Sequence, residues 1–481
     1  GGRVIDPESG LDAVRNVGVD GTRIAAITTD PLPGARSHLD ASGMVVSPGF
    51  IDMHSHAGSI AGCRLQALDG VTTALELEAG ISPVDLAYRL ASDEGRPIHY
   101  GFSASWAISR MMTLAGISST GQLSTFLSHI AEPAWQRAAT SGERSEILAR
   151  MHADLTDGAL GVGILAGYAP RVDPGEYLAI ARLAAEVGCP TYTHARDLVE
   201  IDAETPIDGA EEIVGAALDT GAQMHYCHLN STSRRHVGRV LDLVAQARQE
   251  GASISTEAYP YGAGMTGIGA GFLAPERLAA AGLSPSSLRY VPTGERVASD
   301  ERLAELRQAD PGGLAFVDFL DEDDADDLQC LLRAQLFPDA VIASDAMPIT
   351  WTDQGVDPSR WPLPASAVTH PRTAGTFAKS FRVLYRERSA LSLIEVVSRC
   401  SYLPAKILEG WVPAMRHKGR MTEGCDADIT IFDPDAIGDT ATSASSTSPS
   451  EGIRFVLVNG TFVVHDGRLV EQALPGCPIR S

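Results

Sequence analysis

The segment Gly49-Phe50-Ile51-Asp52-Met53-His54-Ser55-His56 follows a Pro-Gly turn at the end of an apolar run and carries two histidines one residue apart. Side chains alternate along a strand with period two, so both imidazoles point the same way. Imidazole is the commonest ligand of divalent metals in proteins. An HxH pair alone is weak evidence, but at the C-terminal end of a buried strand it predicts a metal site.

The sequence around this segment alternates apolar strand-like runs with helical stretches such as Pro174–Val187, Ala210–Thr220 and Arg239–Gln249. Eight such alternations predict a parallel (β/α)8 barrel, the TIM barrel of the α/β class. The eight runs are Val45–Ile51, Val71–Leu77, Ile98–Phe102, Ala159–Leu165, Pro190–Thr193, Gln223–Cys227, Ser253–Thr256 and Ala340–Ala343.

Both ends of the chain read as short strands separated by turns, including an Asn459-Gly460 hairpin signal. They predict one small β-sandwich domain built from both termini, with residues 1–47 as its first part and residues 415–481 as its second. The barrel then occupies residues 48–414. Roughly eighty residues separate its last two strands, an excess that predicts a lid or insertion at about 265–338.

Composition excludes several classes of protein. The chain has 481 residues, 44% hydrophobic, and a formal net charge of −23, which repels phosphate backbones and argues against nucleic acid as a partner. No apolar run is long enough for a membrane span. The sequence contains seven scattered cysteines without a CxxC pair, so it is not a disulfide framework. The acidic run 321–327 lacks the glycine turn of a calcium loop and is expected to be a solvated helix face or loop.

Three more candidate ligands end predicted strands, namely His194, His228 and Asp345. Each alone would more often be an ordinary core or surface residue. Active sites of barrels are built at the C-terminal ends of their strands. Polar metal-type residues at four such ends therefore predict one shared site.

The second predicted strand carries Glu76 and Glu78, which alternation places on one face, with Leu75 and Leu77 on the other. Strands of a parallel barrel are buried on both faces, so these carboxylates need a partner charge, and a metal supplies one.

Together these residues resemble the amidohydrolase superfamily, most closely its N-acyl-D-amino-acid deacylase (D-aminoacylase) branch. HxH alone indicates the superfamily; Thr193-His194-Ala195-Arg196-Asp197, Tyr259-Pro260-Tyr261 and His370-Pro371-Arg372 point to the branch. The likeness covers nearly the whole chain, and its other segments are Gly2-Arg3-Val4-Ile5-Asp6-Pro7, Pro48-Gly49-Phe50-Ile51-Asp52, Gly70-Val71-Thr72-Thr73, Ser344-Asp345, Leu403-Pro404-Ala405, Ala427-Asp428 and Val458-Asn459-Gly460.

The resemblance implies that His54, His56 and Asp345 hold one divalent metal, zinc by expectation, and that His194 and His228 hold a second with a bridging ligand. In the branch that bridge is a cysteine before a glycine, whereas this chain has Ala79 before Gly80. We infer that a glutamate replaces it, Glu78 first and Glu76 second. A carboxylate tolerates a wider range of metals than a thiolate does.

The resemblance also implies that Arg372 binds the substrate carboxylate and that Tyr259 and Tyr168 lie near the substrate. Guanidinium suits that task through bidentate hydrogen bonds. Asn230 and Met265 stand where the branch often has lysine and serine, which leaves substrate choice open. The expected reaction is hydrolysis of a linear amide of an N-acyl-D-amino acid, in which metal activates water and Asp345 is the general base and acid.

Two alternatives stay open. One is a cyclic-amide or dipeptide hydrolase of the same superfamily, which would not need Arg372. The other is a non-catalytic binding protein on the same fold, which a lack of bound metal would favour. The sequence does not decide whether the chain forms a homo-oligomer. Because it begins Gly1-Gly2-Arg3 rather than with Met, it also leaves a cytoplasmic or a secreted or periplasmic location undecided.

Overall fold

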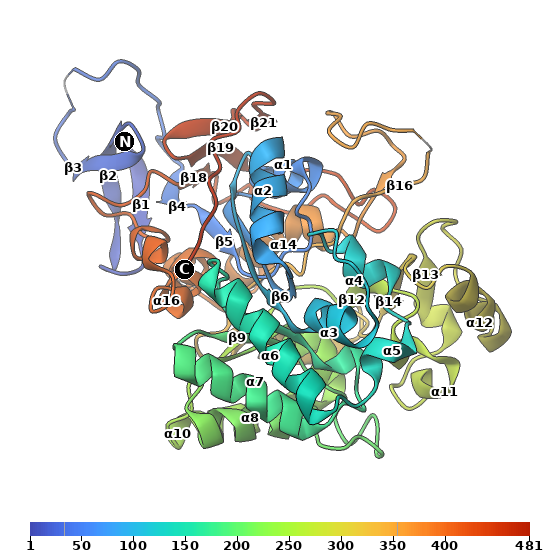
Figure 1. Cartoon of the computed structure of the whole chain (residues 1–481). Helices are drawn as coiled ribbons and strands as arrows, with labels where there is room; N and C mark the ends of the chain where they lie inside the picture. Colours follow the sequence, from blue (N-terminus) through green and yellow to red (C-terminus); the bar gives the residue numbers. More distant parts are fainter. Residues whose placement is uncertain (33, 354) are drawn as a thin grey trace. The chain divides into compact units, whose positions relative to one another are not determined.

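The computed structural model describes residues 1–32, 34–353 and 355–481 (Figure 1). The described chain separates into two compact units. The first consists of Gly1–Leu75, Ala91–Gly101 and Val341–Arg480, and the second of Glu76–Leu90, Phe102–Ala340 and Ser481. No helix among the described residues has the length and apolar character that a membrane span needs.

The predicted (β/α)8 barrel is confirmed. Its eight strands follow one another in the sheet in sequence order. In the first unit, Ser55 pairs in parallel with Ala346 just beyond the first and last of these strands, and the N–H of His56 donates to the carbonyl of Ala346 at 2.7 Å. The barrel strands are β5 (Phe50–Asp52), β6 (Val71–Ile81), β7 (His99–Ser105), β8 (Val162–Leu165), β9 (Thr191–His194), β10 (Met224–Tyr226), β11 (Ile254–Ala258) and β15 (Val341–Ile342).

Strands from both chain ends form one sheet, as predicted for the two termini. Strand β4 (Val45–Pro48) pairs in parallel with β1 (Gly2–Asp6) and antiparallel with β18 (Ile429–Phe432), so it joins N-terminal to C-terminal strands. Apolar side chains from both ends, among them Ile24 and Leu457, share one core. The remaining strands of this eight-stranded sheet are β2 (Leu11–Asp20), β3 (Arg23–Thr28), β19 (Ile453–Val458), β20 (Thr461–His465) and β21 (Arg468–Leu469).

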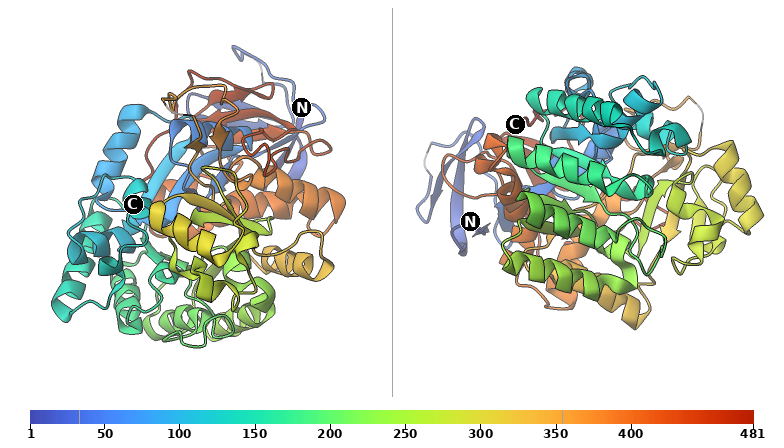
Figure 2. Two further views of the ribbon diagram at one scale, coloured as in Figure 1. Left: turned by 90° about the vertical axis from the view of Figure 1, so that its right-hand side faces the viewer. Right: turned by 60° about the horizontal axis from the view of Figure 1, so that its bottom comes forward.

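Local signals explain where the helices of the second unit begin and end. Helix α7 (Pro174–Val187) starts with proline at its first position, and the Asp173 carboxylate accepts the N–H of Gly175. It stops at Gly188, whose φ of 82° is the left-handed conformation that favours glycine. In Figure 2 helices α7, α8 (Gly209–Thr220) and α10 (Val237–Gln249) lie side by side.

The other helical segments range from three residues in η1 and η2 to 16 in α6. Two of them, η5 and η6, are π-helices that continue the helices before them. The segments are α1 (Ile60–Leu68), α2 (Val84–Glu94), α3 (Trp106–Leu114), α4 (Ser124–Ser128), α5 (Pro133–Gln136), α6 (Ser141–Thr156), η1 (Ala166–Tyr168), α9 (Leu229–Ser233), η2 (Arg234–His236), α13 (Ala325–Leu336), α14 (Arg372–Ser380), η5 (Phe381–Glu387), α15 (Leu393–Val397), η6 (Ser398–Tyr402), α16 (Leu403–Leu408) and η7 (Pro413–His417).

The long segment between β11 and α13 has a small sheet of its own. Strand β14 (Leu314–Asp318) pairs antiparallel with β12 (Ala263–Gly267) and with β13 (Leu288–Tyr290). The helices of this segment are η3 (Gly271–Leu273), α11 (Pro275–Leu278), η4 (Pro285–Ser287) and α12 (Asp300–Ala309). In the first unit, β16 (Thr350–Trp351) and β17 (Ala367–Val368) form a further two-stranded sheet.

The cysteines were not expected to form a disulfide framework, and the acidic run 321–327 was expected to be solvated. All seven cysteines are free thiols.

The acidic run is not wholly solvated. The Asp324 carboxylate accepts the N–H groups of Asp326 and Asp327 and so caps α13, while the buried carboxylate of Asp327 pairs with Arg235 at 2.6 Å. Asp324 thus serves as a helix cap and Asp327 as an ion-pair partner.

Candidate metal centre

The first unit brings together the two histidines of the HxH segment and Asp345. The Nε2 atoms of His54 and His56 lie 3.1 Å apart, and each lies 3.5 Å from Oδ1 of Asp345. All three residues are buried. The histidines follow β5 and Asp345 follows β15, so the chain presents them from the C-terminal ends of two barrel strands.

These three side chains fit a divalent metal. Zinc–nitrogen bonds are about 2.0–2.1 Å, so two nitrogen ligands of one ion lie about 3 Å apart, as the two Nε2 atoms do. A buried carboxylate oxygen facing both nitrogens completes a set of two imidazoles and one carboxylate, which suits zinc and related ions. The chemistry of the donors therefore supports the predicted site.

Asp345 is held in an unusual backbone conformation by Arg372. Its φ of 50° lies in the left-handed region, which costs free energy for a residue other than glycine. The Arg372 guanidinium donates from Nε to the Asp345 carbonyl at 2.5 Å, and its Nη2 lies 2.9 Å from Oδ2 of Asp345. One arginine thus fixes both the backbone and one carboxylate oxygen of Asp345, and the other oxygen faces the histidines.

Asp52 connects the two segments that carry these ligands. Its Oδ1 accepts the N–H groups of His54 at 3.2 Å and of Ser344 at 3.0 Å. Its Oδ2 accepts from the amide of Gln66 at 2.6 Å and from the hydroxyl of Ser344. Burial raises the pKa of this carboxyl to about 6. Asp52 therefore fixes the backbone of His54 and of Ser344, the residue before Asp345.

The second unit holds a second cluster around Glu78 of β6. One carboxylate oxygen, Oε1, lies 2.6 Å from Nε2 of His228 and 3.1 Å from Nδ1 of His194. Glu78 and His228 are buried, and the side chain of His194 is only 14% exposed. Of Glu76 and Glu78, the sequence favours Glu78 as the bridging residue, and in the structure the carboxylate of Glu78 contacts both histidines. Two imidazoles and a carboxylate again form a donor set that suits zinc.

His228 is oriented by neighbours on three sides. Its φ is 28°, and its backbone N–H donates to Oε1 of Glu257 at 3.0 Å. The other oxygen of Glu257 lies 3.0 Å from Nε2 of His225. The hydroxyl of Ser231 lies 3.0 Å from Nδ1 of His228, which leaves Nε2 facing Glu78. Partners of this kind fix the ring of a ligating histidine.

Aromatic rings and a glycine enclose His194. The rings of Tyr168 and Phe272 lie with their centroids 4.8 and 5.9 Å from that of His194, and Phe272 is stacked on it at 16°. The Tyr168 hydroxyl lies 2.8 Å from Oγ1 of Thr266. A Cβ on Gly167 would lie 2.6 Å from Cδ2 of His194, so only glycine leaves room for this ring.

Tyr259 follows β11 and is buried, with its ring centroid 6.4 Å from that of His228. Its carbonyl accepts from the amide of Asn230 at 3.2 Å. The structure thus places Tyr168 beside His194 and Tyr259 beside His228.

The amidohydrolase family matches residues 38–464, which is most of the chain. The chain belongs to the amidohydrolase family. The superfamily predicted from the HxH segment and the strand-end residues is therefore confirmed.

Relatives of this amidohydrolase include enzymes of the predicted branch. It is 28% identical to an N-acyl-D-glutamate deacylase of Alcaligenes xylosoxydans xylosoxydans, covering 96% of this chain and 92% of that one. It is also 28% identical to a D-aminoacylase of the same organism, covering 99% and 95%. An allantoinase of Escherichia coli matches at 26% identity over 52% of this chain and 55% of its own.

A solved structure is similar over the full length of this amidohydrolase. It is an N-acyl-D-glutamate deacylase of Bordetella bronchiseptica in complex with zinc and a phosphonate inhibitor. The TM-score is 0.76 at 24% identity, covering 100% of this chain and 98% of that one. The likeness supports the barrel fold.

Sequence reasoning missed several residues that shape the site of this amidohydrolase. Asp52 was visible as part of the HxH segment, and period two places it on the same face as His54. Glu257, at the end of a predicted strand, had a comparable signal. Gly167 and Phe272 had none, because their roles appear only once the ring of His194 is placed.

Proposed function

We propose that this amidohydrolase removes the acyl group from N-acyl-D-amino acids by hydrolysis of their linear amide bond. The observation that carries the proposal is Oδ1 of Asp345, which lies 3.5 Å from both Nε2 atoms of the HxH pair while Arg372 holds Oδ2. The near-complete match to relatives named N-acyl-D-glutamate deacylase and D-aminoacylase supports the substrate class.

The residues that would hold divalent metal fall into two groups. His54, His56 and Asp345 would hold one ion, and Glu78, His194 and His228 would hold another or share the first. Zinc is the metal we expect. When bound, such an ion polarises the amide carbonyl and makes a water ligand acidic enough to react at neutral pH.

The protein's own groups then position the reactants and move the proton. Oδ1 of Asp345, the oxygen that faces His54 and His56, accepts the proton of the attacking water and passes it to the nitrogen of the leaving amine. Arg372 keeps this carboxylate in place through its contacts with the Asp345 backbone and Oδ2. We further propose that Arg372 contacts the substrate carboxylate, that Tyr168 lies near the same carboxylate, and that Tyr259 lies near the scissile carbonyl.

The test is a substrate panel combined with metal analysis. We expect hydrolysis of N-acetyl-D-amino acids, little hydrolysis of the L-enantiomers, loss of activity after chelation, and recovery with Zn²⁺. Metal content is measured by mass spectrometry on the same samples. A protein that carries metal but cleaves no N-acyl-D-amino acid would contradict the proposal.

A second candidate is hydrolysis of cyclic amides, supported by the partial likeness to allantoinase. Such substrates have no free carboxylate of the kind that Arg372 would bind. Activity on cyclic amides that survives Arg372→Ala would favour this candidate. A third candidate is a non-catalytic binding protein. It requires that the purified protein hold no metal and hydrolyse neither N-acyl-D-amino acids nor cyclic amides.

Three further proposals concern the domain boundaries, the absence of a nucleic-acid partner, and the location and oligomeric state of the protein. The domain boundaries are 1–47, 48–414 with an insertion at about 265–338, and 415–481. The net charge of −23 argues that nucleic acid is not a partner. Cell fractionation would establish where the protein is located, and light scattering would establish whether it forms a homo-oligomer.

A further inference from the structure

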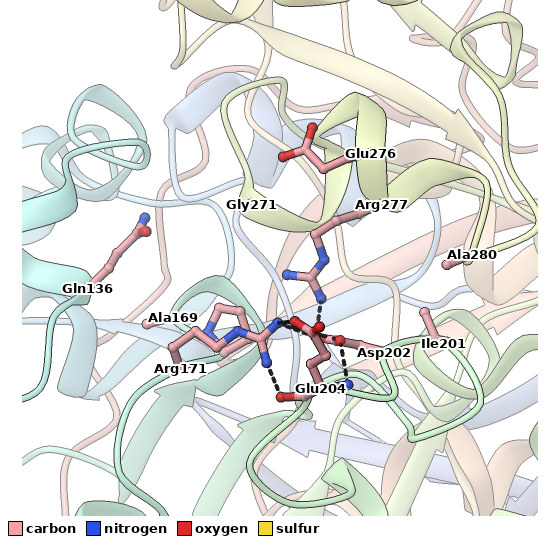
Figure 3. A pocket seen from close by; sticks show the side chains of 11 residues that line it. Gln136, Ala169, Arg171, Ile201, Asp202, Glu204, Gly271, Glu276, Arg277 and Ala280 are labelled. Atoms are coloured by element: carbon pink, nitrogen blue, oxygen red, sulfur yellow. Dashed lines mark hydrogen bonds and ion pairs between the residues drawn. The ribbon is translucent and has the colours of Figure 1, made fainter.

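A cavity of about 500 Å³ in the second unit has no role in the reaction described above (Figure 3). Its size suits a small ligand, since such sites measure about 300–1,000 Å³. Its walls come from the loops after β8 and β9 and from the segment around η3 and α11. The charged residues that line it are Arg171, Asp202, Glu204, Glu276 and Arg277.

Both arginines of the cavity are already paired with carboxylates. Arg277 contacts Asp197. Arg277 also lies 3.1 Å from Asp202, and Arg171 lies 3.1 Å from Asp202 and 3.9 Å from Glu204 (Figure 3). An incoming anion would compete with these carboxylates and be repelled by them. The cavity is therefore unsuited to an acidic group.

Carboxylate oxygens remain available in the same cavity. Glu204 is 91% exposed and holds Arg171 only at 3.9 Å, and Glu276 is exposed, with no ion pair to any residue that the structure describes. Two arginines thus face three carboxylates around one space. A cation that enters gains favourable interactions with Glu276 and Glu204 without displacing an existing pair.

The chain links this cavity directly to the wall of the Glu78 cluster. Ala169 of the cavity follows Tyr168, and Gly271 precedes Phe272. The rings of Tyr168 and Phe272 both pack against His194. Residues directly next to these two rings thus line the cavity, so the cavity and the Glu78 cluster share the segments that carry Tyr168 and Phe272.

We propose that the cavity receives a positively charged group at the end of the substrate's amino-acid side chain, as in an N-acyl-D-lysine, and that Glu276 and Glu204 select it. This inference rests on the proposed deacylase function. It distinguishes this chain from the relative named for D-glutamate, because the cavity's carboxylates disfavour a second carboxylate on the substrate.

The experiment compares kcat/KM for N-acetyl-D-lysine, N-acetyl-D-norleucine and N-acetyl-D-glutamate. Norleucine matches lysine without the amine and so provides the baseline. We expect the lysine substrate to be preferred over norleucine by up to about fivefold, the upper end for solvent-exposed ion pairs, and glutamate to be the poorest. The preference should shrink towards unity in Glu204→Gln/Glu276→Gln, while norleucine turnover stays unchanged.

A matched control is Glu186→Gln, which removes the same charge from an exposed position on α7 outside the cavity. It should retain the preference for lysine. An equal preference in wild type and double variant, or faster turnover of the glutamate substrate, would overturn the inference while leaving the deacylase function intact.

Two further arms separate the remaining outcomes. N-(6-aminohexanoyl)-D-alanine and N-hexanoyl-D-alanine place the amine on the acyl side; a preference that appears only there would refute the assignment to the amino-acid side chain. If no substrate is cleaved, the deacylase proposal fails. Calorimetric binding of N-acetyl-D-lysine against N-acetyl-D-norleucine to wild type and double variant then still decides whether the cavity selects a cation.

Discussion

Arg372 holds Asp345 by two separate contacts, one from Nε to the backbone carbonyl at 2.5 Å and one from Nη2 to Oδ2 at 2.9 Å. Both residues are buried. Because Asp345 has a φ of 50°, the first contact supports a backbone conformation that would otherwise be unfavourable. The second leaves Oδ1 as the oxygen that faces His54 and His56.

Replacing Asp345 by asparagine should strongly lower kcat with little loss of metal. The amide keeps the shape of the carboxylate and can still accept from Arg372, but it cannot accept the proton of water. General acid–base catalysis is worth about 10²–10⁴-fold, so kcat should fall by that factor. Steady-state kinetics and metal content, measured on the same protein, check this. Near-normal hydrolysis by the Asp345→Asn variant would show that the Asp345 carboxylate does not carry the proton.

Arg372→Lys separates the two roles proposed for the arginine. Lysine keeps the charge but loses the planar fork, so both support of Asp345 and carboxylate binding weaken. We expect kcat/KM to fall for an N-acyl-D-amino acid and for its C-terminal amide, with an additional loss of about tenfold or more for the free acid, the worth of a charge-assisted hydrogen bond. Equal losses for both substrates would show that Arg372 acts on Asp345 alone.

Gly167→Ala should damage the second cluster without unfolding the protein. The new Cβ would meet the His194 ring at 2.6 Å and the Ala195 carbonyl at 2.7 Å, so the ring must move away from Glu78. Metal affinity should fall by about 10–100-fold, as for loss of a ligand-orienting contact. Gly215→Ala on α8, where nothing lies within 4 Å of the added Cβ, is the control and should bind metal normally. Isothermal titration with Zn²⁺ on chelator-treated protein measures both.

The two glutamates of β6 can be told apart by substitution. Because Oε1 of Glu78 contacts His194 and His228, Glu78→Gln should lower the metal content and kcat, whereas Glu76→Gln on the same face of the strand should bind metal as wild type does. Metal content after gel filtration is the measurement. The reverse result would assign the bridging role to Glu76.

Asp154 gives a dependence of stability on pH that can be measured away from the metal site. Its buried carboxylate accepts the Ser82 hydroxyl at 2.5 Å and the Val84 N–H at 2.8 Å, yet burial dominates and raises its pKa from 3.8 to about 6. The folded state therefore binds this proton more tightly than the unfolded chain. The stabilisation is complete below about pH 4 and is lost as pH rises through about 6.

Urea unfolding of wild type and Asp154→Asn tests this expectation. The free energy of unfolding of wild type relative to the variant should fall by on the order of 1–1.5 kcal/mol between pH 5 and pH 7.5. The exposed Asp219→Asn serves as the control and should show no such change. A wild-type advantage that grows with pH would mean that the hydrogen bonds to the carboxylate outweigh its burial.

Some of the fold could be predicted because the signals were local. Helix α7 begins and ends at the predicted residues, since Asp173 and Pro174 mark its start and Gly188 its stop. Most buried strands were found from their apolar runs, and the histidines from their place at strand ends. The run Val45–Ile51, predicted as one barrel strand, is instead two strands, β4 in the sheet of the chain ends and β5 in the barrel. The π-helical segments from Phe381 and from Ser398 were not foreseen, because they continue helices with no local boundary signal.

The parts of the site that could not be predicted depend on partners far apart in the sequence. Asp52 and Ser344 are separated by 292 positions, and nothing near either residue indicates the other. Asp327 was expected on a solvated face and is instead buried against Arg235, 92 positions away. Periodicity places a side chain on a face, but only the folded chain determines which distant group meets it.

Strand β4 has a consequence for how the protein can be made. Its two neighbours are β1, which precedes it, and β18, which lies almost 400 residues later and is synthesised long after it. Until then one edge of β4 has open backbone donors and acceptors, which other chains can pair with. Truncation before Ile429 should therefore yield a product prone to aggregate, and ribosome-bound chains should need a chaperone until β18 emerges.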